Sequence, residues 1–187
     1  MRGTKVFVLV SVLLITVVAL STGAAYGERK RYTNARLGIS IEPPVGWAMK
    51  EGTAAVHFVK DLDNLEMSPR ISVRRVGIGN FPLISDSVAY LDAVTKQEEA
   101  LLPAYEVIKQ PSEVVINGKR WATVTSETLT PNRPTSGGRT YRKVRFSTYA
   151  CCLKDGEMLT ILFQAPSDSY ALEGPVFRQA SESLVVE

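Results

Sequence analysis

His57 is the only histidine of the 187-residue chain, so any histidine chemistry has to use it. A histidine acts as a general base when a carboxylate orients it and a nucleophile lies beside it, and the sequence places neither near His57. Asp61, Asp63 and Glu66 follow and could offer oxygen ligands to a hard cation. They lack the glycine and the spacing of a calcium loop, so we interpret them as a solvated acidic loop. We expect no catalytic residue, no metal ligand and no cofactor.

Cys151 and Cys152 are the only cysteines, and they are adjacent in the chain. Neighbouring residues of a strand point to opposite faces, so a disulfide between them would require a distorted peptide. We interpret both as small apolar residues of a strand. A strained vicinal disulfide, which could sense redox state, and an intermolecular bridge are the alternatives.

A run of basic residues on a predicted strand over residues 139–153 is the main candidate for a binding surface. Lys143 and Arg145 share one face of that strand and Arg142 lies on the other. A solvated sheet edge is one interpretation. The alternative is a docking patch for an acidic partner or anionic lipid headgroups, which the adjacent loop at 129–138 favours because binding residues concentrate on loops. The candidate partner-binding residues are Arg133, Arg139, Lys143 and Arg145.

The N-terminus has the pattern of an export segment. Arg2 and Lys5 precede an apolar run over residues 6–20, and Ala25 and Gly27 fit the small-residue positions before a signal-peptidase cleavage site. The segment contains no cysteine, which excludes a bacterial lipoprotein anchor.

This pattern predicts a signal peptide over residues 1–27 and a linker over 28–36. The alternative is an uncleaved anchor, because residues 6–25 are long enough to span a bilayer. The protein is therefore expected outside the cytoplasm, in a bacterial periplasm or secreted, or held at the membrane by residues 6–25.

Charge argues against nucleic acid as a partner. The full chain has 22 Lys and Arg against 19 Asp and Glu, and the leader holds two of the basic residues and none of the acidic ones. The mature domain of about 160 residues then has a net charge of +1. It lacks the basic footprint that phosphate backbones require.

Alternating residues and turn signals predict a mainly β domain. Asn117-Gly118 and Asp155-Gly156 are hairpin signals, and the prolines and glycines of residues 129–138 predict a loop that is neither helix nor central strand. The predicted strands are residues 37–41, 56–59, 71–76, 105–109, 113–116, 120–128, 139–153 and 157–165.

Two helices are expected among these strands. The first starts at a cap at Ser85 or Asp86 and ends at Pro103. The second starts after residue 167 or 168, or as late as Pro175. Consecutive hairpins with helices packed on them define an α+β fold with an antiparallel sheet.

Three stretches, residues 37–47, 115–121 and 153–166, together resemble the Mog1/PsbP-like group of domains, including its bacterial secreted members. The resemblance implies an α/β/α sandwich, an antiparallel sheet flanked by helices, over residues 37–187. It also implies a non-enzymatic accessory, binding or assembly role, although a shared fold does not carry a shared partner. The leader differs from those of photosystem-associated members, so no photosystem or metal role is implied.

The sequence therefore favours an exported, non-catalytic accessory or binding protein of the cell envelope. Its expected partner is another envelope protein or complex, with membrane association through an uncleaved N-terminus as a further option. The alternative is a small-ligand or metal-binding carrier, or an enzyme, with its site in the cleft between sheet and helix.

Overall fold

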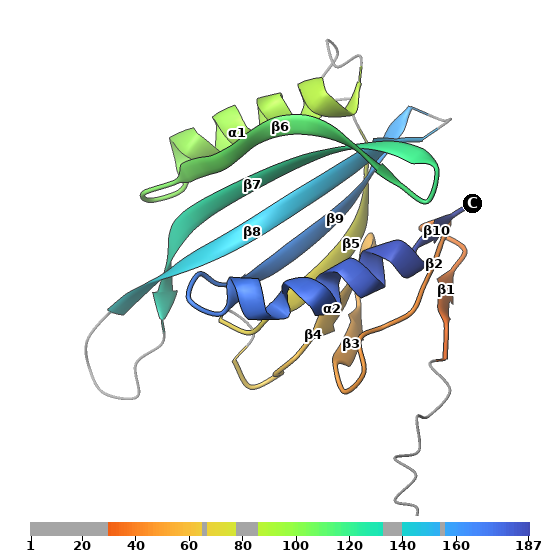
Figure 1. Ribbon diagram of the computed structural model, residues 1–187, viewed down its shortest axis with the longest axis horizontal. Helices are drawn as coiled ribbons and strands as arrows, with labels where there is room; N and C mark the ends of the chain where they lie inside the picture. The colour runs from red at the N-terminus through yellow and green to blue at the C-terminus, as the bar shows by residue number, and fades with distance from the viewer. Residues whose placement is uncertain (1–29, 65–66, 78–85, 133–139, 154–155) are drawn as a thin grey trace, which may run out of the picture.

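The computed structural model describes residues 30–64, 67–77, 86–132, 140–153 and 156–187 (Figure 1). The strands are β1 (Tyr32–Asn34), β2 (Ile39–Ile41), β3 (Ala48–Glu51), β4 (Ala55–Val59), β5 (Arg70–Gly77), β6 (Glu106–Ile116), β7 (Lys119–Asn132), β8 (Thr140–Cys152), β9 (Glu157–Pro166) and β10 (Val185–Val186). The helices are α1 (Ser87–Leu101) and α2 (Tyr170–Ser183).

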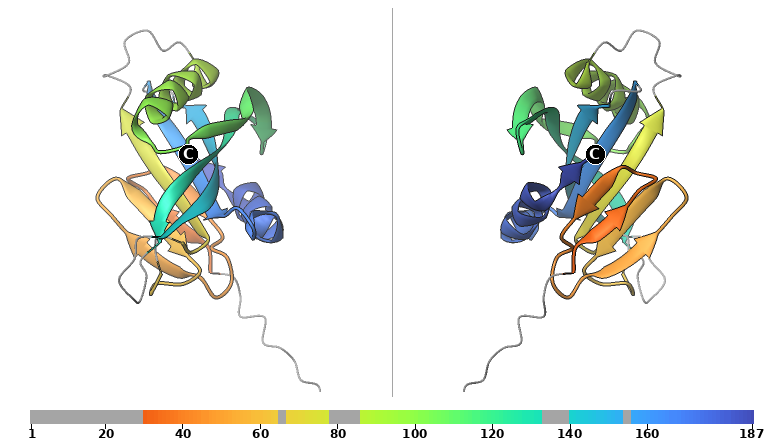
Figure 2. Two further views of the ribbon diagram at one scale, coloured as in Figure 1. Left: turned by 90° about the vertical axis from the view of Figure 1, so that its left-hand side faces the viewer. Right: turned by 90° about the vertical axis from the view of Figure 1, so that its right-hand side faces the viewer.

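Seven strands form one antiparallel sheet in the order β3-β4-β5-β9-β8-β7-β6, and a small sheet has the order β1-β2-β10. The two helices lie on opposite sides of the large sheet (Figure 2). We call the sheet face that carries α1 the α1 face, and the other the α2 face. Helix α1 packs on β6, β7 and β8, while α2 contacts β9 and β2. The α+β class and the flanked antiparallel sheet expected from the sequence are confirmed.

Two apolar clusters hold these layers together. The larger one lies on the α2 face, where Phe163 stacks on Phe177 of α2 with 4.7 Å between ring centroids, and it also takes in the buried Trp121 and Ile39. The smaller one joins Leu91 of α1 and its neighbours to the apolar residues of β7, β8 and β9. Burial of this apolar surface supplies most of the driving force for folding.

Helix α1 begins where its cap predicts. The Asp86 carboxylate accepts hydrogen bonds from the backbone N–H groups of Val88 and Ala89 at 2.9 and 2.8 Å, which satisfies donors that the first turn leaves free. Helix α2 starts at Tyr170, so a start delayed to Pro175 is wrong. The carbonyl of Ala171, which Pro175 leaves without its helical donor, belongs to an exposed residue and can bind water.

The predicted hairpin at Asn117-Gly118 is confirmed, because Ile116 pairs with Lys119 across it. Both turn residues have positive φ, 50° and 75°, as a two-residue turn between twisted strands requires. The predicted loop over residues 129–138 is wrong in its first part, since β7 continues to Asn132. Pro131 fits there because β6 pairs with β7 only as far as Glu127, so this end of β7 is an edge that needs no donor.

Three short strands lie outside the predicted set. Strand β1 falls inside the range 28–36 expected to be a linker and pairs with β2, so the folded part begins before residue 37. Strands β3 and β10 are also absent from the sequence-based set. All three have at most four residues, too few to show an alternating pattern. The predicted signal peptide lies outside the described residues and stays a prediction.

Candidate functional site

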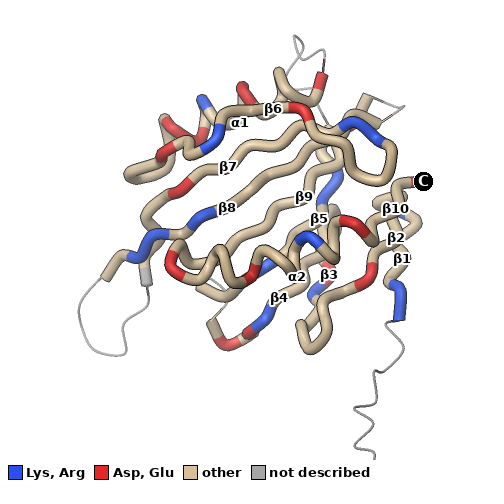
Figure 3. The backbone as a smooth tube through the Cα atoms, in the orientation of Figure 1, with Lys and Arg blue, Asp and Glu red and all other residues tan. Residues whose placement is uncertain are grey.

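Two of the predicted basic residues of β8 meet at one carboxylate. Glu127 of β7 pairs with Arg145, and Lys143 lies two residues away on the same α2 face. Lys143 Nζ donates to Oε1 of Glu127 at 2.8 Å, and Arg145 Nη2 donates to Oε2 at 3.1 Å. The Glu127 side chain is 7% exposed, against 62% for Lys143. We call these three residues the Glu127 cluster; Figure 3 shows the basic positions of β8 beside an acidic position of β7.

The cluster holds fixed charges. Burial raises the pKa of the Glu127 carboxyl, but hydrogen bonds from Lys143 and Arg145 outweigh this effect and lower it to about 2. The hydrogen bond to Glu127 in turn raises the pKa of Lys143. A general acid or base needs a pKa near the working pH, and these shifts move both groups away from neutrality. The cluster therefore suits electrostatic binding better than proton transfer.

A groove of about 370 Å³ opens beside the cluster, between α2 and strands β6 to β9. We call it the α2 groove. Arg145 extends over the ring of Tyr170, with its guanidinium carbon 5.7 Å from the ring centroid, a cation–π arrangement. The hydroxyls of Tyr170 and Ser147 lie 2.6 Å apart and share a hydrogen bond. Tyr149 and Tyr170, both half-buried, line the groove above the buried rings of Phe163 and Phe177, so it combines an aromatic wall with polar groups.

The rim of the α2 groove is basic. Lys109 of β6 and Arg178 of α2 both line it and are exposed, and within the described ranges neither forms an ion pair. Farther along β8, Arg142 pairs with Asp168, just before α2. The rim therefore presents two positive charges that are free to meet an acidic group.

The four predicted partner-binding residues do not all lie together. Lys143 and Arg145 come together on the α2 face, and Arg145 lines the α2 groove. Arg142 lies on the opposite face, as the strand pattern predicts, because it pairs with Thr130 in the alternate register. Arg133 and Arg139 lie outside the described residues.

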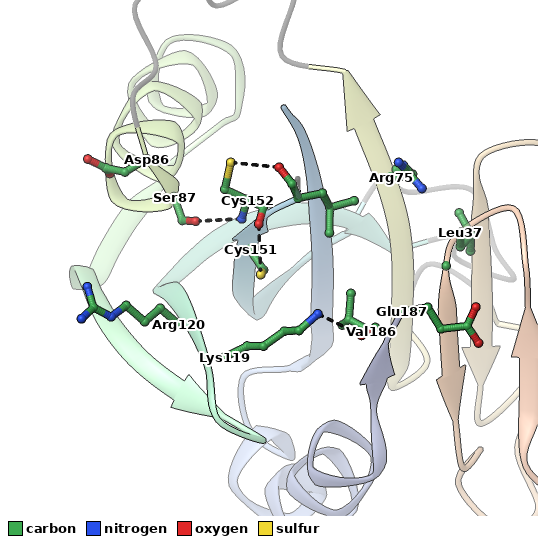
Figure 4. A pocket seen from close by; sticks show the side chains of 12 residues that line it. Leu37, Arg75, Asp86, Ser87, Lys119, Arg120, Cys151, Cys152, Val186 and Glu187 are labelled. Atoms are coloured by element: carbon green, nitrogen blue, oxygen red, sulfur yellow. Dashed lines mark hydrogen bonds between the residues drawn. The ribbon is translucent and has the colours of Figure 1, made fainter. Parts of the chain in front are cut away.

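The cysteines lie at another pocket, of about 750 Å³ (Figure 4). Cys151 is buried, Cys152 is exposed, and both are free thiols. Burial raises the pKa of the Cys151 thiol, which keeps it protonated and unreactive. The backbone N–H of Cys152 donates to Ser87 Oγ at 3.1 Å, and Lys119 Nζ donates to the Val186 carbonyl at 2.9 Å. These contacts tie the pocket wall to α1 and to β10.

His57 lies on β4, where its Nδ1 is 2.8 Å from Ser72 Oγ. Burial and the nearby charges of Arg70, Lys50 and Arg74 lower its pKa. In the acidic loop Asp61 and Asp63 are exposed, and Glu66 lies outside the described residues. Among the described residues, no three His, Cys, Asp or Glu side chains group as ligands for a metal ion.

The large antiparallel sheet with a helix on each face is the Mog1/PsbP-like fold. Solved structures similar to the chain are cyanobacterial PsbP (CyanoP) from Synechocystis, LpqN, involved in cell envelope biogenesis of Mycobacterium tuberculosis, and the Ran-binding protein Mog1p of Saccharomyces cerevisiae. The similarity to CyanoP has a TM-score of 0.58 at 16% identity and covers 90% of this chain and 99% of that one.

LpqN is similar with a TM-score of 0.54 at 13% identity, over 79% of this chain and 82% of that one. Mog1p is similar with a TM-score of 0.53 at 13% identity, over 84% and 94%. At these identities the similarity establishes the fold alone. No protein-family model and no curated protein sequence matches the chain.

Sequence reasoning missed five residues of the site: Glu127, Ser147, Tyr170 and the two rim residues Lys109 and Arg178. Glu127 stands in an alternating strand and has no local signal that it accepts from two basic residues. Its partner Arg145 is 18 positions away, and only the register of β7 with β8 sets them side by side.

Within the described ranges neither helix has the length and apolar character that crossing a membrane requires.

Proposed function

We propose that the protein is an exported, non-catalytic accessory or binding protein of the cell envelope, and that the α2 groove binds an acidic segment of a partner protein. The observation that carries this proposal is the pairing of an aromatic wall with the exposed charges of Lys109 and Arg178. Aromatic residues and arginine are the groups that dominate protein interfaces. An acidic side chain flanked by an apolar one fits this combination.

Two further observations support an envelope role. The leader over residues 1–27 has the pattern of an export signal. LpqN, which has the same fold, is involved in cell envelope biogenesis, and Mog1p binds the protein Ran, so the fold serves protein binding in at least one other setting. The charges of the Glu127 cluster stay fixed at neutral pH, which suits a binding surface better than a catalytic one.

The test is capture from a solubilised envelope fraction on the immobilised mature domain. The groove variant carries Lys109→Glu and Arg178→Glu, and the control carries Lys96→Glu, an exposed position of α1 on the other side of the sheet. We expect one protein to be retained by the wild type and the control and lost by the groove variant. The same retained proteins on all three surfaces would contradict the proposal.

A small-ligand carrier is a second candidate, favoured by a cavity of about 200 Å³ between α1 and the sheet. Val94, Phe146 and Leu162 supply apolar walls, and Glu98 lines it too, with a pKa that burial raises. Native mass spectrometry of the protein as isolated tests this function. A bound mass that Val94→Trp removes would favour the carrier over the binding module.

A further inference from the structure

A second basic surface lies on the α1 face, on β3, β4 and β5. Helix α1 packs on β6, β7 and β8, whereas β3, β4 and β5 lie toward the other edge of the sheet (Figure 2). Lys50 of β3 pairs with His57 of β4, and His57 pairs with Ser72 of β5. Arg70 and Arg74 lie two residues to either side of Ser72 and so share its face.

These side chains start from neighbouring positions of three adjacent strands, from which the long basic ones can reach a common ligand. Partner Cα atoms on adjacent strands lie about 5 Å apart, and alternate residues of one strand lie about 7 Å apart. The nearness of Arg70, Lys50 and Arg74 adds to the effect of burial in lowering the pKa of His57. Lys50 and Arg74 are exposed, while His57 and Arg70 are half-buried.

Among the described residues, no carboxylate forms an ion pair with Arg70. Its Nη2 donates to Oε1 of Gln164 at 2.7 Å, and its Nε is buried without a hydrogen-bond partner among the described residues. Burial lowers the pKa of Arg70, and no described carboxylate opposes that effect. Arg74 donates to the hydroxyl of Thr160 at 3.3 Å. On α1, burial raises the pKa of Glu98, and the positive charge of Arg74 lowers it by a smaller amount.

The grouping of Arg70 with Lys50 and Arg74 has an electrostatic free-energy cost, which a bound anion would lower. Partly burying a guanidinium without a counter-charge is unfavourable, and placing further positive charges around it adds repulsion. Guanidinium groups present their N–H donors in a fork that matches the oxygens of phosphate. The hydroxyl of Ser72 and the imidazole of His57, hydrogen-bonded to each other, add neutral polar groups between the two arginines.

We propose that Lys50, Arg70 and Arg74, together with Ser72 and His57, form a binding site for a tetrahedral oxyanion of the phosphate class. The ligand group is a phosphate monoester or diester, free in solution or in a lipid headgroup. The site lies on the face opposite the α2 groove and does not depend on the function proposed for that groove.

His57 makes this site measurable, because it is the only histidine in the chain and gives a single imidazole signal in NMR. Sulfate is the first probe, since it has phosphate geometry but does not titrate between about pH 5 and 9. A bound dianion stabilises the imidazolium, so sulfate should raise the pKa of His57 in a saturable way. Sodium chloride at equal ionic strength should raise it less, because screening acts without a specific site.

Variants locate the binding. Arg70→Gln removes a charged donor and should weaken sulfate binding about tenfold, and Arg74→Gln should act in the same direction. Arg120→Gln, at an exposed arginine beside the β6–β7 hairpin and on a strand not adjacent to β5, is the matched control and should leave the affinity unchanged. Without sulfate, Arg70→Gln should unfold at no lower temperature than the wild type, because it removes an uncompensated charge. An arginine with a purely structural role would lose stability instead.

Inorganic phosphate and vesicles then distinguish the two sources of the ligand group. Saturable binding of inorganic phosphate that Arg70→Gln weakens supports a free oxyanion. Binding only to vesicles of phosphatidylglycerol, not of phosphatidylcholine, with the same loss in Arg70→Gln, supports a headgroup. The proposal is overturned if sulfate leaves the His57 pKa no higher than chloride does, or if Arg70→Gln and Arg74→Gln bind as the wild type does.

Discussion

Glu127 is the residue that organises the basic side chains of the α2 face. It accepts from both Lys143 and Arg145 while almost fully buried, so the positive charges on its two neighbours are held at fixed positions. Removing such a carboxylate would leave two like charges side by side. The basic strand seen in the sequence is thus partly a structural network, and the exposed Lys109 and Arg178 are better reporters of binding.

Glu127→Gln should lower the free energy of unfolding by about 1–3 kcal/mol at pH 7, since the hydrogen bonds from Lys143 and Arg145 then reach a neutral acceptor. Urea denaturation measures the change. Asp92→Asn is the matched control, because it breaks the exposed Asp92–Lys96 pair of α1 and should cost less than about 0.5 kcal/mol. Equal losses of unfolding free energy in the two variants would show that the buried ion pairs of Glu127 stabilise the fold no more than an exposed pair does.

The difference in unfolding free energy between the wild type and Glu127→Gln should depend on pH. The pKa of Glu127 is about 2 in the folded state and about 4.3 in an unfolded chain. A carboxyl with a depressed folded pKa contributes fully above its unfolded value and loses that contribution as the pH falls toward its folded value. The stability difference between wild type and Glu127→Gln should therefore shrink between pH 5 and pH 2.5. A constant difference across that range would contradict the assignment.

The two cysteines should behave as separate thiols. Cys152 is exposed and should react with a thiol reagent in the folded protein, while the buried Cys151 should react only after denaturation. A thiol count with and without denaturant gives one and then two. A count of zero in both conditions would indicate a disulfide.

At the scale of elements, the turns carry the register of the sheet. Gly118→Ala should lower the free energy of unfolding by about 1 kcal/mol, because Gly118 has φ +75° and an L side chain is strained there. No heavy atom lies within 4 Å of the added Cβ, so the cost is one of backbone conformation and not of a clash. Gly77→Ala is the control, as Gly77 also has open space but no positive φ, and it should be neutral.

The long elements of this fold could be predicted from the sequence, because their signals are local. The cap at Asp86 and the turn at Asn117-Gly118 determine their own backbone geometry. The end of β7 was mispredicted because Pro131 excludes a central strand but is tolerated at the edge position that the structure shows. Whether a position is central or edge depends on the whole sheet, which no local pattern contains.

The candidate site was predictable only in its basic half. Lys143 and Arg145 stand out as a charge pattern, but the aromatic wall of the α2 groove is assembled from β8, β9 and α2, which only the fold brings together. The proposed oxyanion site could not be predicted from the sequence either, because its residues also come together only in the folded sheet. Arg70 and Arg74 are separated in sequence from Lys50, and only the register of β3, β4 and β5 collects them around His57.

At the scale of the molecule, the sheet separates two positively charged surfaces. The α2 groove faces one side with Lys109 and Arg178, and the proposed oxyanion site faces the other with Lys50, Arg70 and Arg74. The net charge of +1 expected for the mature domain does not reveal these two local groupings of positive charge. Variants on one face should leave binding at the other unchanged, since contacts so far apart act independently.

The function that we propose for the α2 groove is to bind an acidic segment of a partner protein. Its most direct test is the affinity of the captured partner for the mature domain, measured at low and at physiological salt. We expect Lys109→Glu with Arg178→Glu to weaken binding at least tenfold, Lys96→Glu to leave it unchanged, and salt to weaken the wild-type complex. Equal affinities for the wild type and the groove variant would contradict it.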